Sequence, residues 1–185
     1  MEWFFSDTHF SHDNIIRLCN RSFSSVGEMN SVIMGNIHAN IRSSDVSYFL
    51  GDFSWDNSLG YNWWKEIPGK KFFIKGNHDY KLWDNINRDK HDLNTITVPG
   101  YLDTEIHRIP ITMCHYPMLT WNKSHYGSIL LYGHHHGNKE IQNKFPGKRT
   151  DVGVDAWNYT PISFDEVMDA MNKLPTNWDY LRHNK

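Results

Sequence analysis

The sequence predicts a mixed α/β domain in which buried strands alternate with amphipathic helices. The first observation is a set of short apolar runs, each followed closely by polar residues or glycine, as expected of buried strands that end in loops. These runs cover residues 3–5, 46–50, 72–74, 109–113 and 129–132. The second observation is a pair of helical patterns with capping-box starts. Strands alternating with helices are typical of layered α/β or α+β domains.

Both helical patterns begin with serine followed three residues later by glutamate, which is the capping-box pattern. Ser25 and Glu28 precede apolar residues at helical spacing, at positions 29, 32, 33 and 37. Ser163 and Glu166 precede a second such pattern, which Pro175 should end.

Length and composition indicate which broad classes of protein this chain can belong to. A chain of 185 residues with 15% aromatic residues is expected to form one domain over residues 1–185 with a real core. Acidic and basic residues are interspersed and the net charge is −2, which argues against a broad basic surface for duplex nucleic acid. The two cysteines are expected to be reduced thiols. We find no signal-peptide pattern and no apolar stretch of membrane-spanning length, so a cytoplasmic protein is expected.

Histidine, aspartate and asparagine gather directly after the predicted strands. Taken singly, an Asp-x-His or Gly-Asp pair is usually an ordinary turn, so the joint pattern is the informative signal. In chain order it comprises Asp7 and His9, Gly51-Asp52, Gly76-Asn77-His78-Asp79, His115, and Gly133-His134-His135-His136. Loops that follow strand ends can meet at one edge of a sheet, where such folds bind ligands.

These residue types suit two divalent transition metals. Imidazole combined with carboxylate favours Mn, Fe, Zn or Ni over Mg or Ca. Two cations about 3.5–4 Å apart repel each other, so a bridging carboxylate is required. On an extended segment the two side chains of Asp7-x-His9 point the same way.

The ordered set D-x-H, G-D, G-N-H-D, H and G-H-x-H, from Asp7 to His136, resembles the calcineurin-like metallophosphoesterases. The segments DTHFSHDNI and GVDAWNYTPIS are similar to the small single-domain bacterial and phage branch of that superfamily. The resemblance implies a four-layer α/β/β/α sandwich with two mixed sheets, and metals at the carboxyl edge of the strands.

The resemblance also implies a role for each motif residue. Asp7, His9 and His136 would hold one metal, and Asn77, His115 and His134 the other, with Asp52 as the bridge. The implied reaction is hydrolysis of a phosphodiester or phosphomonoester by a metal-bound water or hydroxide, with manganese the expected metal and Fe, Zn or Ni as alternatives. His78 would act as general acid or charge stabiliser, and Asp79 would orient His78.

Substrate contacts are harder to predict. Arg21 and His12 follow the first ligand pair and are candidates for contacts to phosphate, Arg21 in a bidentate manner. Tryptophans at positions 55, 63, 64, 83 and 121 could stack on a base, although packing in the core or at a rim is the more common role.

The sequence differs from two branches of this superfamily, and these differences argue against their functions. The stretch GDFSWDN lacks the G-D-x-x-D-R-G pattern of the Ser/Thr protein phosphatases, and the short chain lacks the capping regions of the larger nucleases. We therefore expect a phosphodiesterase, in preference to a monoesterase, acting on a small phosphate ester, a nucleotide or a single-stranded nucleic-acid end. The alternatives are a non-catalytic scaffold of the same fold, which typically loses the residue equivalent to His78, and a structural zinc protein, which Asn77 disfavours.

Overall fold

The computed structural model describes residues 1–144 and 147–177, so the expected domain of residues 1–185 extends beyond the described part. Nine strands form a five-stranded and a four-stranded sheet within these ranges. The strands are β1 (Glu2–Phe5), β2 (Val46–Phe49), β3 (Lys70–Ile74), β4 (Thr95–Val98), β5 (Tyr101–Ile106), β6 (Ile109–Cys114), β7 (Ile129–Tyr132), β8 (Arg149–Asp151) and β9 (Ile162–Ser163). The α-helices are α1 (Asp13–Leu18), α2 (Val26–Asn40), α3 (Asn57–Glu66), α4 (Tyr80–Arg88), α5 (Lys139–Lys144) and α6 (Phe164–Met171).

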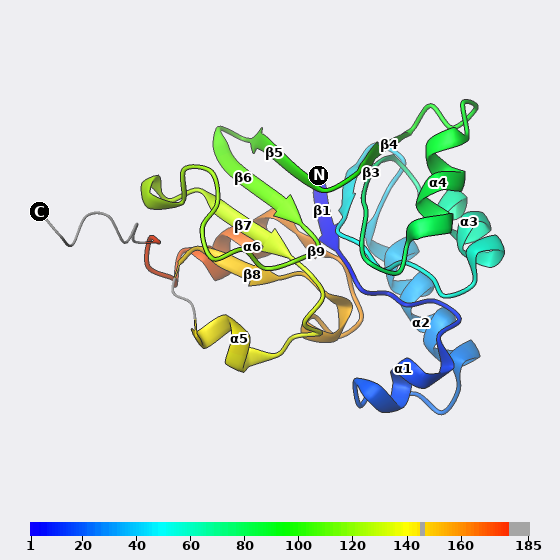
Figure 1. Cartoon of the computed structure of the whole chain (residues 1–185). Coiled ribbons are helices and arrows are strands. Elements are labelled where there is room, and N and C mark those ends of the chain that lie inside the picture. The colour runs from blue at the N-terminus through cyan, green and yellow to red at the C-terminus, as the bar shows by residue number, and fades with distance from the viewer. Residues whose placement is uncertain (145–146, 178–185) are drawn as a thin grey trace, which may run out of the picture.

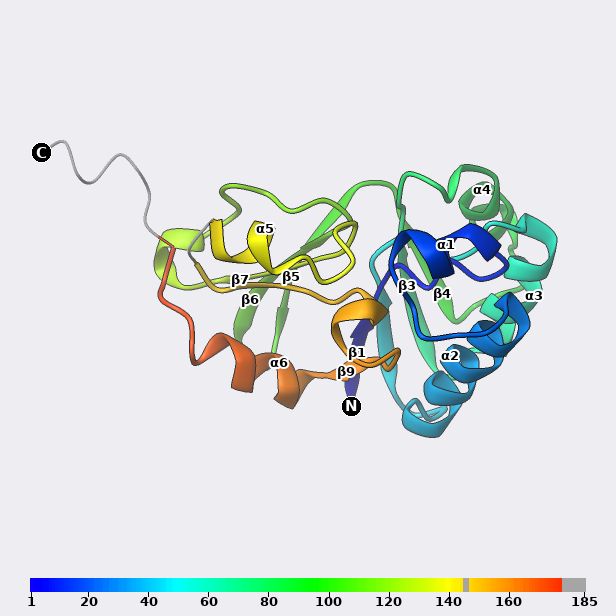
Figure 2. The same cartoon turned by 90° about the horizontal axis from the view of Figure 1, so that it is seen from below.

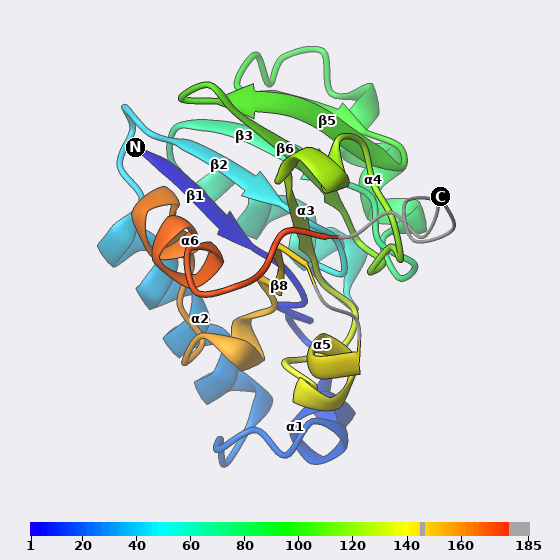
Figure 3. The ribbon, with the colours of Figure 1, turned by 90° about the vertical axis from the view of Figure 1, so that its left-hand side faces the viewer.

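Both sheets are mixed. The first has the order β4-β3-β2-β1-β9, in which β1 to β4 are parallel and β9 is antiparallel to β1. Figure 3 shows β1 and β2 running side by side in the same direction. The second has the order β5-β6-β7-β8, with β5 antiparallel to β6 and the other pairs parallel. The predicted mixed α/β fold with two mixed sheets is thus confirmed.

Alternation along the strands builds separate cores on the two faces of each sheet. In β1, Trp3 and Phe5 pack with helices α1 to α4, whereas Phe4 packs in a cluster that both sheets share. In β7, Ile129 and Leu131 enter the shared cluster. Figures 1 and 2 show α1 to α4 on one side of the molecule, and the second sheet with α5 and α6 on the other. The first sheet therefore has helices on one face and the second sheet on the other.

The five predicted strands correspond to β1, β2, β3, β6 and β7, and the two capped helices to α2 and α6. The Ser163 hydroxyl accepts the backbone N–H of Glu166, and the Glu166 carboxylate accepts the backbone N–H of Ser163. In α2 the Ser25 hydroxyl also accepts the N–H of Glu28, but the Glu28 carboxylate binds Ser24 instead of closing the box. The sequence prediction missed four strands and four helices, among them the edge strands β4, β5 and β8.

Strands of both sheets end at the same place. The backbone N–H of Asp7, after β1, donates to the carbonyl of Gly51, after β2, at 2.9 Å. The N–H of Ser6 donates to the carbonyl of Val152, after β8, at 3.1 Å, which links the two sheets. Figure 1 shows β6 and β7 ending beside β1 near the middle of the molecule. The polar segments predicted to follow the strands therefore converge.

None of the helices in the described ranges has the length and apolar character that crossing a bilayer requires, and the longest, α2, has 15 residues.

We predict that Ser163→Ala lowers the free energy of unfolding by about 1 kcal/mol, because the substitution leaves the first turn of α6 without its cap. Urea denaturation measures this change. Ser31→Ala, at an exposed position inside α2, is the matched control and should change stability little or raise it slightly. Equal effects of the two substitutions would contradict the role given to the cap.

Candidate metal centre

The loops that carry the predicted ligands have an unusual backbone. Five of these residues lie in the left-handed region, with φ of 56° at Asp7, 49° at His9, 62° at Asp52, 73° at His134 and 49° at His136. This conformation is uncommon for residues other than glycine and costs of order 1–3 kcal/mol each. Such strain concentrates at functional sites, because the surrounding structure has to enforce it.

Asp7, His9 and His136 form the first group. One potential ligand atom from each lies within 4.8 Å of the others. The Asp7 Oδ2 atom accepts the Ser6 hydroxyl at 2.6 Å and the His134 N–H at 2.9 Å. Asp7 Oδ1 and His9 Nε2 are buried and have no hydrogen-bond partner in the described part of the chain. Buried polar atoms without partners are costly, and a cation between them would satisfy both.

Asp52, His115 and His134 form the second group, again with ligand atoms within 4.8 Å of one another. His115 Nδ1 lies 2.8 Å from the Leu50 carbonyl, which can only accept, so Nδ1 carries the proton. The other nitrogen, Nε2, faces Asn77 Oδ1 at 2.9 Å and Asp52 Oδ2 at 3.4 Å. A proton on Nε2, or a cation in its place, would hold these three atoms together.

Asp52 lies between the two groups. Its Oδ2 atom is 3.7 Å from His9 Nε2 and 3.4 Å from His115 Nε2. Its Oδ1 atom accepts the backbone N–H of His78 at 2.9 Å. The structure therefore brings together all seven predicted ligands, with Asp52 in the position expected of a bridge. The donor set of imidazole, carboxylate and one amide oxygen fits two transition-metal ions.

Charge also favours cations at this place. Burial raises the pKa of Asp7. Burial by itself lowers the pKa of His136, but its hydrogen bond to Asp155 and the charge of Asp7 outweigh burial and raise the pKa to about 10. His115 behaves likewise, since Asp52 and Asp7 outweigh burial and raise its pKa to about 9. The buried carboxylates thus draw protons onto the histidines, and metal ions would compete for the same positions.

Arg21 is not placed to bind a substrate, which corrects the sequence prediction. Its side chain is buried and forms a bidentate pair with Asp155, at 2.8 Å for both Nε and the second terminal nitrogen. Its terminal nitrogens also donate to the backbone carbonyls of Asp7, at 2.7 Å, and Thr8, at 2.9 Å. Arg21 therefore fixes the backbone of the first ligand loop.

Asp155 orients His136, a role that the sequence analysis did not assign to it. Besides pairing with Arg21, its Oδ2 atom accepts from His136 Nδ1 at 2.7 Å. This bond leaves Nε2 as the ring nitrogen free to bind a metal. Asp155 lies in the segment GVDAWNYTPIS, which carries part of the family resemblance and is the sequence signal for its role.

Asp79 does not orient His78, which is a second correction. Its carboxylate is fully buried and accepts the backbone N–H groups of Asp52 at 2.7 Å, Phe53 at 2.9 Å and Gly76 at 2.8 Å. Asp79 thus ties the loop after β2 to the loop after β3 and fixes the bridging residue. Burial, reinforced by the charge of Asp52, raises the pKa of Asp79 to about 6.

His78 and His12 lie at the open side of the centre. The His78 side chain is 44% exposed, and its Nε2 atom is 3.9 Å from Asp52 Oδ2. The His12 ring meets the Trp55 ring edge-on at 4.2 Å and lies 5.7 Å from the His9 ring. Burial lowers the pKa of His12, which favours a neutral imidazole beside the first group. Both residues are near enough to the ligands to contact a bound molecule.

Three glycines make room for the ligands. A Cβ atom on Gly76 would collide with Asp52, and one on Gly133 would collide with Asp7. A Cβ atom on Gly51 would come within 2.6 Å of His115 Nδ1. Contacts this short are not tolerated, so any side chain at these positions would displace a ligand.

Cys19, His136 and Asp155 also have potential ligand atoms within 4.8 Å of one another. The Asp155 carboxylate already pairs with the Arg21 guanidinium, whose positive charge repels a cation. We therefore assign His136 to the first group.

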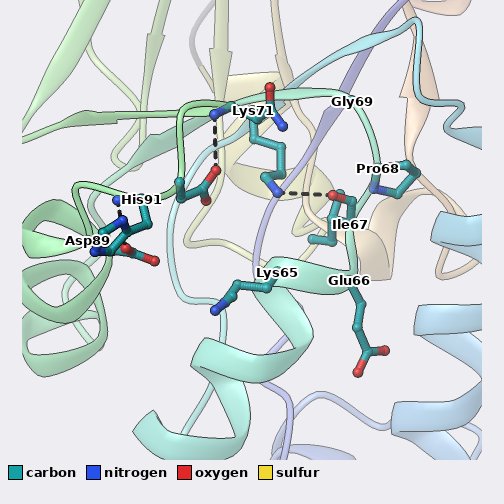
Figure 4. A pocket seen from close by; sticks show the side chains of 10 residues that line it. Lys65, Glu66, Ile67, Pro68, Gly69, Lys71, Asp89 and His91 are labelled. Carbon is teal, nitrogen blue, oxygen red and sulfur yellow. Dashed lines mark hydrogen bonds between the residues drawn. The ribbon is translucent and has the colours of Figure 1, made fainter.

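A separate hollow of about 350 Å³ lies at the opposite end of β3, between the end of α3 and the segment before β4 (Figure 4). Lys71 is buried beside it and donates to the carbonyl of Ile67 at 3.0 Å. Basic and acidic residues line it together, among them Lys65, His91, Asp89 and Asp92. The hollow is therefore distinct from the candidate metal centre in both its position and its mixed charge.

Comparison with known proteins shows the family of this chain. It is 33% identical over 178 residues to the uncharacterized protein MJ1445 of Methanocaldococcus jannaschii, and the match covers 91% of this chain and 89% of that protein. The chain belongs to the MJ1445 family. No family model matches it.

Two further relatives extend the MJ1445 family comparison. The Gene 66 protein of Mycobacterium phage L5 is 27% identical, over 93% of this chain and 94% of its own length. The crystal structure of AQ665 from Aquifex aeolicus, a protein of unknown function, superposes with a TM-score of 0.68 at 27% identity, over 91% of this chain and 98% of that one. The fold is therefore shared over almost the whole length of both chains.

We predict that Gly76→Ala weakens metal binding by about 10- to 100-fold, because the added methyl group displaces Asp52. The substitution should also lower the free energy of unfolding by about 1–3 kcal/mol. Metal titration and urea denaturation measure the two effects. Gly35→Ala is the matched control, since a Cβ atom there meets nothing within 4 Å; it should keep metal binding and raise stability by about 0.5–1 kcal/mol. Unchanged metal binding in Gly76→Ala would contradict the role given to Asp52.

Proposed function

We propose that this protein is a di-metal phosphoesterase of the calcineurin-like type. The observation that carries the proposal is Asp52 Oδ2, which lies between two groups of buried ligand atoms while an exposed imidazole, His78, lies 3.9 Å away. A purely structural metal site would be closed by its ligands. Here Asn77 and His78 are exposed, so a substrate can reach the centre.

The arrangement of layers supports the same proposal. Two mixed sheets share one apolar cluster, and helices α1 to α4 cover the far face of the first sheet. This arrangement is compatible with the four-layer α/β/β/α sandwich that the sequence resemblance implies. The position of the ligands at the carboxyl ends of β1, β2, β3, β6 and β7 is compatible with it as well.

The chain's own residues would perform distinct parts of the hydrolysis. When bound, the two ions would supply an activated water and neutralise the phosphate oxygens; manganese is the proposed metal, with Fe, Zn and Ni as alternatives. His78 would hold a proton at Nε2 and donate it to the leaving oxygen. Asp79 and Arg21 would keep the ligand loops in place, through the backbone of Asp52 and Asp7 respectively.

We favour phosphodiesters over phosphomonoesters as substrates. Trp55 and Tyr116, which lie beside different residues of the centre, are 56% and 50% exposed and could contact organic groups on both sides of a phosphate. A small phosphate ester, a nucleotide or a single-stranded nucleic-acid end would fit this description.

We predict that the purified protein with Mn²⁺ hydrolyses bis-p-nitrophenyl phosphate faster than p-nitrophenyl phosphate. His78→Ala should lower the rate by about 10²–10⁴-fold while both metals stay bound, because the substitution removes the group that protonates the leaving oxygen or stabilises charge on the transferred phosphoryl group. Rates are followed by nitrophenolate absorbance and metal content by elemental analysis. His38→Ala, on the exposed face of α2, is the matched control and should leave the rate unchanged. A wild-type protein that binds two metals and hydrolyses neither ester would contradict the proposal and favour a non-catalytic scaffold.

A further inference from the structure

Trp55 holds a large aromatic ring in solvent beside the metal centre. It is 56% exposed, and its ring lies 5.5 Å from the His78 ring and 4.2 Å from the His12 ring. Its backbone is fixed, since its N–H donates to the Phe10 carbonyl at 2.8 Å and the neighbouring Ser54 forms a bridge with Phe10. A half-exposed tryptophan on a fixed backbone presents an apolar face to bound molecules at little entropic cost.

Tyr116 presents a second exposed ring, beside the second group of residues. It is 50% exposed, and its ring lies 5.1 Å from the His115 ring and 4.7 Å from the His134 ring. Its hydroxyl donates to Asn77 Oδ1 at 3.3 Å. Tyr116 therefore contacts the second group of ligands, whereas Trp55 contacts His78 and the side of the first group.

Other exposed aromatic residues in the described part of the chain lack this relation to the centre. They are Tyr80, Tyr101 and Tyr126. Tyr80 follows the GNHD segment, but the Lys75 ammonium covers its ring at 4.4 Å. Trp55 and Tyr116 are therefore the two exposed aromatic residues in the described part of the chain whose rings contact residues of the candidate centre.

We propose that Trp55 and Tyr116 bind the two organic groups of a phosphodiester, and that the substrates are nucleotidyl phosphodiesters. The inference rests on the proposed function. A monoester has one organic group, whereas a diester has two, and nucleobases are the common biological groups that stack on such rings. Stacking tolerates different bases, because every base has a π face.

The position of His78 assigns the two rings to different groups. In hydrolysis, a bond forms between phosphorus and the oxygen of water, and the bond to the leaving oxygen breaks as that oxygen takes a proton. His78 would supply this proton, so the ring beside it, Trp55, binds the leaving group. Tyr116 binds the group that stays on the phosphate.

Two esters with the same leaving group test this assignment. They are the p-nitrophenyl ester of thymidine 5′-monophosphate and methyl p-nitrophenyl phosphate. Tyr116→Ala should lower kcat/KM for the thymidine ester about 5- to 100-fold more than for the methyl ester. Trp55→Ala should lower both by a similar factor, and Trp55→Phe should restore most of the rate because the ring is kept.

Three controls separate stacking from structural damage. Tyr116→Phe keeps the ring and loses only the hydroxyl bond to Asn77, so it should retain the preference for the thymidine ester. Tyr126→Ala removes an exposed ring in the 3₁₀ turn Ser124–Tyr126 and should change neither ester. Metal content should be the same in all variants. Equal losses on both esters in Tyr116→Ala, or no loss in either alanine variant, would overturn the inference.

Binding of reaction products distinguishes this inference from the proposed function. The Mn²⁺-loaded protein should bind thymidine 5′-monophosphate more tightly than inorganic phosphate, and Tyr116→Ala should remove most of that advantage. If neither ester is hydrolysed but this preference exists and depends on Tyr116, nucleotide binding by Tyr116 stands and the hydrolase proposal fails. If both esters are hydrolysed and the nucleotide has no advantage over phosphate, the hydrolase proposal stands and the inference fails.

Discussion

Two buried carboxylates, those of Asp7 and Asp52, are the constraint around which the rest of this structure is arranged. Each follows a parallel strand of the first sheet and lies where water cannot compensate its charge. Burial of an ionised carboxylate is tolerated only with hydrogen bonds and a nearby positive charge. Backbone N–H groups, the Ser6 hydroxyl and imidazoles provide part of this compensation. Cations would provide the remainder.

The need to hold these two carboxylates in place also explains the conformation of the loops and the residues around them. The loops bend through left-handed conformations so that ligand atoms from both sheets face one point. Glycines at positions 51, 76 and 133 leave no atoms where the ligands need space. Arg21 and Asp79 are buried and charged, and both bind the backbone of ligand loops instead of solvent or substrate. These bonds hold the loops after β1, β2 and β3 in their strained conformations.

The sequence predicted the strands that end in ligands, because their apolar runs are continuous and chemistry-bearing residues mark their ends. It missed β5, which alternates exposed and half-buried residues at a sheet edge, and β8, which has only three residues. The meeting of the seven predicted ligand residues was predictable, because residue type and order mark the ends of these strands. The roles of Arg21, Asp79 and Asp155 were not, since spacing along the chain does not say which atoms a buried charge will meet. The burial of Trp64 could likewise be known only from the packing of α3 against β3, and the exposure of Trp55 only from the course of the loop before α3.

The most direct test of a two-metal centre is a crystal structure of the protein grown with Mn²⁺, with anomalous scattering used to locate the ions. We expect two anomalous peaks about 3.5–4 Å apart. Asp52 should lie between them, with Asp7, His9 and His136 around one and Asn77, His115 and His134 around the other. A single peak, or peaks elsewhere on the molecule while Asp7 and Asp52 keep their present positions, would contradict the two-metal arrangement and the hydrolysis built on it.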